Sequence, residues 1–275
     1  MESNSPSKDW FAVWFDSHHY HQLYGHRSDA EAKAFMERLH VEWGGGNLQL
    51  LDLACGRGRH ARAAAELGHE VLGLDLSQNS IEEAQNRHAG VPGLSFVVGD
   101  MRHFELGRSF DGVLNLFTSF GYFDRKADHL SVLRQVHRHL RPGGFLVLDF
   151  LDTPFAKARL VPKDEITRDG VTYQMERHVE REPGADWDTF VKRIVHDGPE
   201  GRGEHVERVA ALNEEDLTGM LESSGFNIVT RYATTLWRLG RPGKPRASFI
   251  SQPHDCRHHT CPRRSGGWPD GRMVG

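Results

Sequence analysis

A glycine-rich turn near the start of the chain has the residue types that bind a phosphate or a nucleotide. Residues 50–60 read Leu-Leu-Asp-Leu-Ala-Cys-Gly-Arg-Gly-Arg-His, so small residues separate an apolar run from an Ala-rich segment. Glycine permits close backbone approach, and the start of the following helix offers unpaired N–H groups. The dinucleotide pattern G-x-G-x-x-G is incomplete because Ala61 takes the third position, although alanine is sometimes accepted there. The turn, centred on Cys55, Gly56 and Gly58, therefore predicts a nucleotide-like ligand.

Acidic residues that follow three apolar runs narrow the choice of ligand. Asp52 ends the first run, where a carboxylate suits a cationic amino acid group better than a pyrophosphate, so S-adenosylmethionine is favoured over NAD. Asp75 ends the second run, roughly 20 residues beyond the turn, where a carboxylate can bind both ribose hydroxyls. Capping of the next helix is the alternative for Asp75, but Ser77 is available for that. Asp100, next to Met101, is a candidate partner for the adenine amino group, with a plain turn as the alternative.

Apolar runs alternate with helix-like segments over the middle of the chain. Strands are expected at 48–53, 69–75, 94–98, 110–116 and 144–150, and helices at 59–67, 77–88 and 126–140. This order predicts an α/β fold, in which a doubly wound, Rossmann-like and mostly parallel sheet occupies residues 44–150. Residues 1–43, with a helix from about Asp29, are expected to form an N-terminal helical cap.

The pattern changes after the fifth expected strand. Runs at 171–180, 186–196 and 204–212 are separated by turns that contain Gly or Pro, as in antiparallel strands. We therefore expect residues 151–212 to form a β-rich substrate lobe inserted beside the core. The core is expected to continue over 213–232, as a helix over 214–223 capped by Asn213 and a strand over 226–232.

Composition and charge argue against several kinds of partner. The 275 residues include 34 Lys and Arg against 38 Asp and Glu, so no overall basic field attracts nucleic acid or an anionic membrane. The N-terminus lacks a signal-peptide pattern, and no apolar run approaches the roughly 20 residues that span a bilayer. Three cysteines are too few for a disulfide framework. We expect a cytoplasmic protein with a small-molecule partner and with neither a nucleic-acid nor a membrane partner.

Taken together, the motifs resemble those of class I S-adenosylmethionine-dependent methyltransferases. The matching segments are Asp52-Leu-Ala-Cys-Gly-Arg-Gly, Asp75, Gly99-Asp100 and Leu140-Arg-Pro-Gly-Gly144, within a similarity over about residues 10–232. The resemblance implies that S-adenosylmethionine is the cofactor. It places the donor against residues at the strand ends: Asp52, Ala54, Cys55, Gly56, Gly58, Asp75, Leu76, Asp100, Met101 and Leu116. Ala54 stands where many members have glycine.

Within that family, the chain most resembles small-molecule methyltransferases with a β insertion after the fifth strand, including glycine N-methyltransferase-like enzymes. In these enzymes an N-terminal aromatic and basic segment closes over the donor. Residues 20–27, Tyr-His-Gln-Leu-Tyr-Gly-His-Arg, match that segment. The resemblance implies that Tyr24 and Arg27 contact the donor, with Arg27 pairing its carboxylate. The alternative is that Tyr24 packs in the core and Arg27 is solvated.

The segment after the fourth strand, Asn115-Leu-Phe-Thr-Ser-Phe-Gly-Tyr122, is expected at the carboxyl end of the sheet, where open α/β folds bind ligands. It should face the transferred methyl group. Thr118 and Tyr122 are candidates to orient the acceptor, together with Tyr20, and packing beneath the insertion is the alternative. The segment lacks the Asp/Asn-Pro-Pro-aromatic signature of many DNA and protein amide methyltransferases, which argues against those substrates.

Residues 233–275 do not look like the end of a class I methyltransferase. Members of the family resemble one another in closing the sheet with a hairpin whose last strand runs antiparallel to its neighbours. This stretch is rich in Arg, Pro, Gly and His and shows little strand alternation. We expect a disordered or out-of-frame tail and a sheet without its last strand pair. Cys256 and Cys261 could form part of a metal site, but no second pair follows, so no metal is expected.

These features predict an enzyme that moves a methyl group from S-adenosylmethionine to an N, O or C atom of a small-molecule acceptor. A sulfonium donor is already activated, so transfer depends on positioning, desolvation and a deprotonated acceptor. A general base is dispensable, and none of the 18 histidines is assigned as a catalytic residue. The alternatives are a non-catalytic S-adenosylmethionine-binding protein and an NAD-dependent oxidoreductase.

Overall fold

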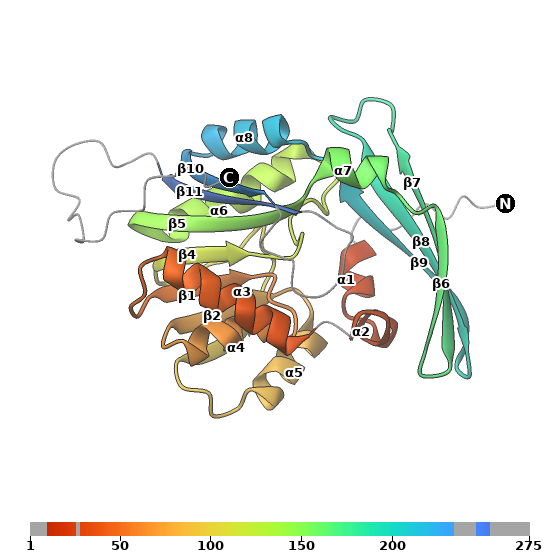
Figure 1. Ribbon diagram of the computed structural model, residues 1–275, viewed down its shortest axis with the longest axis horizontal. Helices are drawn as coiled ribbons and strands as arrows, with labels where there is room; N and C mark the ends of the chain where they lie inside the picture. Colours follow the sequence, from red (N-terminus) through yellow and green to blue (C-terminus); the bar gives the residue numbers. More distant parts are fainter. Residues whose placement is uncertain (1–9, 26–27, 234–245, 254–275) are drawn as a thin grey trace, which may run out of the picture.

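The computed structural model describes residues 10–25, 28–233 and 246–253. Its elements are, in chain order, α1 (Trp10–Trp14), α2 (His18–Tyr24), α3 (Asp29–Glu42), β1 (Gln49–Leu53), α4 (Arg59–Glu66), β2 (Glu70–Asp75), α5 (Gln78–Arg87), β3 (Leu94–Val98), β4 (Phe110–Asn115), α6 (Lys126–His139), β5 (Leu140–Leu151), α7 (Thr153–Ala158), β6 (Lys163–Arg168), β7 (Val171–Glu180), β8 (Thr189–Gly198), β9 (Gly201–Ala210), α8 (Glu214–Ser223), β10 (Phe226–Ala233) and β11 (Arg246–Pro253). Figure 1 shows their arrangement as a core beside a smaller β lobe. The expected α/β fold is confirmed.

The larger sheet brings the carboxyl ends of its central strands to one edge. Its strand order is β10-β11-β5-β4-β1-β2-β3. Parallel pairing joins β1 to both β2 and β4, β2 to β3, and β4 to β5. The chain order reverses between β1 and β4, and open α/β sheets bind ligands outside the carboxyl ends of the strands at such a switch point. The strand ends at Leu53, Asp75 and Asn115 therefore define where the site should lie.

Two apolar layers enclose this sheet. Leu51 and Leu53 of β1 pack in the layer that contains residues of α6 and α8, whereas Leu50 packs with residues of α3 and α4. Figure 1 shows α3, α4 and α5 on one side of the sheet and α6 and α8 on the other. Alternate residues of a strand point to opposite faces, so a strand buried on both faces needs apolar residues at successive positions. This is the physical origin of the apolar runs in the sequence.

The end of the described chain corrects the expectation of a lost strand pair. β11 lies between β5 and β10 and pairs antiparallel with both, with Val147 opposite Ile250 and Thr230 opposite Ile250 on the other side. The sheet therefore has its closing hairpin, and the prediction that this strand pair is missing is wrong. The alternation was hard to recognise because Ser and Arg interrupt it, but backbone pairing on both sides supplies hydrogen bonds that do not depend on side-chain type. The remainder of the expected tail falls in 234–245 and 254–275, beyond the described residues.

The lobe is an antiparallel sheet with strand order β6-β7-β8-β9, one strand more than the sequence pattern predicts. The additional strand is β6, whose side chains are mostly exposed, so apolar alternation could not reveal it. In Figure 1, α1 and α2 lie between the core and this lobe, and α1 contacts β9. In contrast, α3 packs against α4 in the core. The two short helices are therefore placed to cover the carboxyl edge of the large sheet.

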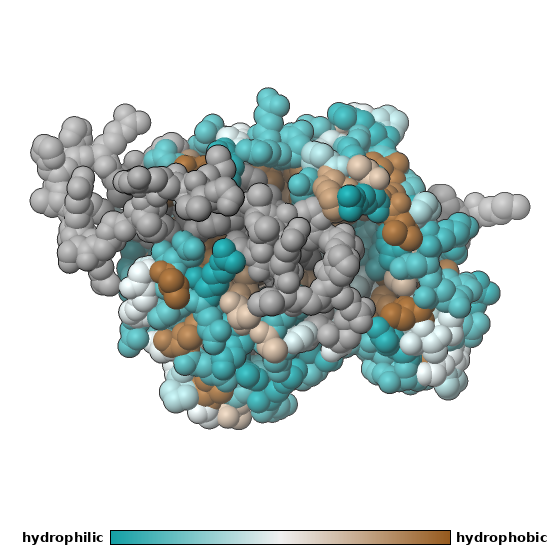
Figure 2. Space-filling view, viewed as in Figure 1, coloured by the Kyte–Doolittle hydropathy of each residue, from teal (hydrophilic) through white to brown (hydrophobic). Residues whose placement is uncertain are grey.

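Hydrophilic side chains dominate the described surface on the face shown in Figure 2, and apolar side chains form only small separate patches there. The large apolar side chains Trp14, Phe110, Phe120 and Phe150 are almost fully buried. Among the described helices, none is both long and apolar enough to cross a membrane.

Candidate active site

The glycine-rich turn after β1 follows a left-handed path. The backbone φ is +62° at Ala54, +53° at Gly56 and +76° at Gly58. Alanine tolerates this conformation poorly, which accounts for the glycine that many class I methyltransferases have at the position of Ala54. A Cβ atom added to Gly56 would meet nothing within 4 Å, whereas one added to Gly58 would lie 2.5 Å from the ring of Phe96. Gly56 therefore leaves room for a ligand, and Gly58 lets the start of α4 pack closely against Phe96 of β3.

Asp75 ties the end of β2 to this turn. Its Oδ2 accepts a hydrogen bond of 2.7 Å from the N–H of Gly56, and its Oδ1 accepts one of 2.9 Å from the N–H of Ser77. The cap of α5 is Ser77, whose Oγ accepts from the N–H of Ser80 over 3.0 Å. Capping is therefore not the role of Asp75. Burial raises the pKa of its carboxyl, although these hydrogen bonds oppose the shift.

Asp52 is a buried carboxylate with an unpaired oxygen. The residue is 2% exposed, and its Oδ2 has no hydrogen-bond partner among the described residues. Burial, reinforced by the nearby charge of Asp75, raises the pKa of Asp52 to about 7. Asp52 lines a cavity of about 590 Å³ at the carboxyl edge of the sheet. An unpaired buried carboxylate is costly unless a cation compensates it, so this side chain fits the positively charged S-adenosylmethionine.

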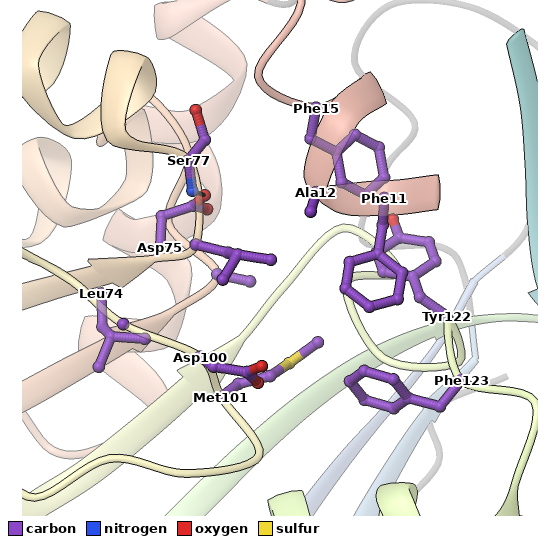
Figure 3. Close-up of a pocket in the computed structure, with 13 residues that line it drawn as sticks. Phe11, Ala12, Phe15, Leu74, Asp75, Ser77, Asp100, Met101, Tyr122 and Phe123 are labelled. Atoms are coloured by element: carbon purple, nitrogen blue, oxygen red, sulfur yellow. Dashed lines mark hydrogen bonds between the residues drawn. The ribbon is translucent and has the colours of Figure 1, made fainter. Parts of the chain in front are cut away.

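A smaller pocket of about 50 Å³ adjoins this cavity, and Figure 3 shows its walls. An aromatic side opposite Asp75 and Asp100 is formed by Phe11 of α1, by Phe15 in the turn that follows α1, and by Tyr122 and Phe123. Ala54, Asp75, Phe15 and Tyr122 line both spaces, which makes them parts of one site. An aromatic slot beside carboxylates suits a planar base that carries N–H donors.

Asp100 lies in that pocket, but Arg102 already engages its carboxylate. The guanidinium of Arg102 donates to Oδ2 over 2.6 Å and to Oδ1 over 3.1 Å. The same guanidinium lies 5.5 Å from the ring centre of Phe11 and 5.0 Å from that of Phe123. The N–H of Arg102 and a second contact of its Nε bring the hydrogen bonds that Asp100 accepts to four, about the capacity of a carboxylate. A ligand that bonds to Asp100 must therefore replace one of them. Sequence reasoning did not identify this role of Arg102.

The two spaces bring together nearly all the residues selected from the sequence. They are lined by Tyr20, Tyr24, Asp52, Ala54, Cys55, Gly56, Asp75, Leu76, Asp100, Met101, Leu116, Thr118 and Tyr122. Gly58 lies outside them, against Phe96, and has a packing role. Arg27 falls outside the described residues. The contacts of these residues with a donor or an acceptor remain predictions.

The exit from β4 is held in a constrained conformation by Asp149 of β5. Phe117 and Thr118 have backbone φ values of +62° and +59°, in the left-handed region. The N–H of Phe117 donates to Oδ2 of Asp149 over 2.8 Å, and the N–H of Thr118 donates to the Asp149 carbonyl over 3.0 Å. Such strain persists only where the surrounding structure enforces it. The sequence analysis did not identify Asp149 as a functional residue. A charged residue inside the apolar run Leu-Val-Leu-Asp-Phe could have indicated this role.

Thr118 places a hydroxyl in the cavity wall. The residue is 8% exposed, and its Oγ1 has no hydrogen-bond partner in the described part of the chain. Burying a hydroxyl without a hydrogen-bond partner costs free energy, and a ligand that bonds to the hydroxyl removes that cost.

The lobe adds a polar cluster that the sequence did not reveal. The Tyr24 hydroxyl and the Trp14 Nε1–H each donate to Oε1 of Glu207 over 2.7 Å. Lys192 also hydrogen-bonds to the Tyr24 hydroxyl and lies 4.8 Å from its ring centre. These contacts join positions from 168 to 193 residues apart in sequence. No local pattern indicates contacts of that range.

Within the described ranges, no group of three or more His, Cys, Asp or Glu residues is arranged to hold a metal ion. Three histidines do gather where α2 meets the lobe: His19 stacks on His196 with ring centres 3.6 Å apart, and His196 lies 5.4 Å from His205. Cys256 and Cys261 belong to the residues that are not described.

Comparison with known proteins agrees with this geometry. Residues 50–144 match the family model described as a methyltransferase domain. The chain is 34% identical over 138 residues to dTDP-3-amino-3,4,6-trideoxy-alpha-D-glucopyranose N,N-dimethyltransferase of Streptomyces venezuelae, across 50% of this chain and 56% of that protein. It is 30% identical over 183 residues to dTDP-4-amino-2,3,4,6-tetradeoxy-D-glucose N,N-dimethyltransferase of Saccharopolyspora spinosa, across 66% of this chain and 65% of that one. The match thus spans between half and two thirds of these relatives.

The fold matches as well. An S-adenosylmethionine-dependent methyltransferase from Clostridium acetobutylicum superposes with a TM-score of 0.68 over 88% of this chain and 97% of that chain, at 20% identity. A likeness at that identity shows the fold alone, whereas the family match locates a methyltransferase domain at residues 50–144. Together with the glycine-rich turn and the buried carboxylates at the ends of β1 and β2, they identify residues 50–144 as a methyltransferase domain and support a class I S-adenosylmethionine-dependent methyltransferase.

Proposed function

We propose that this protein transfers the methyl group of S-adenosylmethionine to a nucleophilic atom of a small-molecule acceptor. The observation that carries the proposal is the buried, unpaired Oδ2 of Asp52 beside the open face of Gly56, in a cavity that continues into an aromatic slot. A cationic donor compensates that carboxylate, whereas the anionic pyrophosphate of NAD is repelled by it. This favours methyl transfer over nicotinamide chemistry.

In this proposal each part of the site has a defined role. Asp75 binds the ribose hydroxyls of the donor with the lone pairs that Gly56 and Ser77 leave free. The slot between Phe11 and Tyr122 takes the adenine, next to Asp100. The donor supplies an activated methyl group. The chain excludes water with the aromatic side chains of α1 and α2 and orients the acceptor at the β4 exit, where Thr118 lies.

The acceptor side of the cavity is built from the lobe. Leu151, Phe155, Val191 and Val209 line it and are contributed by residues 151–212. We therefore propose that this lobe selects the acceptor. The volume of about 590 Å³ suits a molecule of the size of a sugar derivative placed beside the donor. The names of the relatives from Streptomyces venezuelae and Saccharopolyspora spinosa specify amino sugars, which makes an amine on a sugar-like molecule the first acceptor class to test.

Two measurements test the function. Calorimetry should detect binding of S-adenosylmethionine and S-adenosylhomocysteine and no binding of NAD. Incubation with methyl-labelled donor and a small-molecule cell extract should then give a labelled product, identified by mass spectrometry. Donor binding without any labelled product would instead indicate a non-catalytic donor-binding protein. Replacement of residues 151–212 by the lobe of a relative should change which acceptor is labelled.

A further inference from the structure

The lobe presents the carboxylate of Glu207 to the large cavity. The donor contacts proposed above do not use this carboxylate. Glu207 of β9 lies directly opposite Lys192 of β8 in the lobe sheet. Their side chains are 17% and 15% exposed, and both residues line the large cavity. An ion pair this well shielded costs desolvation energy, so its position in the wall of a cavity needs an explanation.

The two oxygens of Glu207 differ in their surroundings. Oε1 accepts two hydrogen bonds of 2.7 Å, one from Trp14 and one from Tyr24, and these fix the orientation of the carboxylate. Oε2 receives no hydrogen bond from any described residue. Among the described residues it forms an ion pair with Nζ of Lys192 at 3.6 Å, beyond hydrogen-bond distance. The carboxylate is thus held rigidly with one oxygen free to accept.

We propose that Oε2 of Glu207 accepts a hydrogen bond from the amino group of the acceptor, so that the enzyme methylates nitrogen. This inference rests on the proposed function and names the acceptor atom and the residue that holds it. A carboxylate only accepts hydrogen bonds and repels anions, so it recognises an N–H or O–H group and rejects a phosphate or carboxylate in the same place. An amine fits better than a hydroxyl because its partial or full positive charge is attracted to the carboxylate.

Lys192 gives the pair a second property. An ammonium group has no lone pair to attack a methyl group, so the acceptor must react as a free amine. The positive charge of Lys192, 3.6 Å from Oε2, disfavours a second cation in the same place and therefore favours the neutral form of the bound amine. In the reaction the nitrogen lone pair forms the new N–C bond while the electrons of the broken S–C bond stay on sulfur. The positive charge passes to the methylated nitrogen, and its extra proton leaves to solvent.

The first test is the position of the label. Methyl-labelled donor and a small-molecule cell extract should yield products in which the label is on nitrogen. Labelled products methylated only on oxygen or carbon would overturn the inference while leaving the proposed methyl transfer intact. Donor binding without any product would overturn the proposed function as well, so the two failures can be told apart.

The second test uses Glu207→Gln, with Glu204→Gln as its matched control. Glu204 lies on the same strand but is 47% exposed and pairs with Arg193. With the methylated amine identified in the first test as substrate, Glu207→Gln should raise its KM about tenfold or more, because a hydrogen bond to a charged group is lost. Glu204→Gln should behave as the unchanged protein. Circular dichroism and thermal unfolding verify that each variant is folded, and a folded Glu207→Gln with an unchanged KM would overturn the assignment.

The third test uses the pH dependence of kcat, which a purely structural role would not move. Lys192→Met leaves Glu207 uncompensated and favours the bound ammonium, so the pH of half-maximal kcat should rise. Glu207→Gln removes the negative charge and keeps the positive charge of Lys192, so it should lower that pH. Shifts in the same direction, or no shift in either folded variant, would contradict the proposed role of the pair.

Discussion

Asp75 and Gly56 form the hydrogen bond that joins the second strand to the glycine-rich turn, with 2.7 Å between Oδ2 and the backbone nitrogen. The same carboxylate binds the start of α5 through Ser77. A single side chain therefore sets the relative position of three backbone segments at the donor site. We therefore expect donor affinity to depend on this carboxylate even without the proposed contact between Asp75 and the ribose.

Asp75→Ala is expected to weaken binding of S-adenosylmethionine by roughly 1.5–3 kcal/mol, the cost of losing a hydrogen bond to a charged group. Calorimetry measures this directly. Asp111→Asn is a suitable control because Asp111 bonds to Gln49 and Arg141 at the start of the strands, away from the site. A folded Asp75→Ala variant that retains its affinity would remove Asp75 from the donor site.

Donor binding should strengthen as the pH rises through about 7, because burial raises the pKa of Asp52 to about 7 from the 3.8 of an ordinary aspartate. The donor cation favours the ionised form, so binding below that pH releases a proton. Without the donor, the free energy of unfolding should change in the opposite direction. The contribution of protonated Asp52 is complete below pH 3.8 and is lost as the pH rises through about 7. Calorimetry in two buffers of different ionisation enthalpy measures the released proton, and Asp52→Asn should abolish it.

Thr118→Val should separate function from stability. Valine keeps the branched shape at the left-handed position and removes a buried hydroxyl that has no described partner, so the free energy of unfolding should be unchanged or higher by up to about 1 kcal/mol. The KM of the acceptor should rise. Urea unfolding and steady-state kinetics on the same preparation test both parts, and a marked loss of stability would show that the hydroxyl is already satisfied.

Truncation after Ala233 should destabilise the protein severely. It removes β11, which pairs with β5 over Leu146 to Leu151 and with β10 on its other side. Within the described sheet β10 would then lose its neighbour, and β5 would keep only β4. Circular dichroism and thermal unfolding report the effect. Truncation after Pro253 is the control, because it keeps β11. Equal stability of the two shortened proteins would contradict the pairing of β11 in the sheet.

The histidines between α2 and the lobe should make the protein sensitive to acid. Burial, together with neighbouring histidines, lowers the pKa of His205 to about 4 from 6.5 and also lowers the pKa of His19. Burial lowers the pKa of His196 as well. Their stabilisation is therefore complete above pH 6.5 and is lost as the pH falls toward 4. Urea unfolding across this range should show a smaller loss in His205→Gln than in the unchanged protein. The exposed His178 supplies the control substitution.

Much of the donor site could be predicted from the sequence because parallel strands obey a simple rule. Leu48 to Leu53 and His69 to Asp75 are apolar runs, and the polar residues that end or follow such runs must meet at one edge of the sheet. Asp52, Gly56 and Asp75 converge for that reason. The cap of α5 at Ser77 could also be predicted from neighbouring residues, because it requires only a serine three residues before a helical N–H.

The acceptor side was decided only by the tertiary structure. In the sequence, Glu207 and Lys192 look like ordinary charged residues of their strands. They form a polar cluster with Trp14 and Tyr24 only because α1 and α2 pack against the lobe from the other end of the chain. β6 and β11 likewise lack a clear alternation, yet each pairs through backbone hydrogen bonds with a neighbour already in place. Local sequence predicts which face of a strand is apolar, but contacts between distant segments depend on how the whole chain packs.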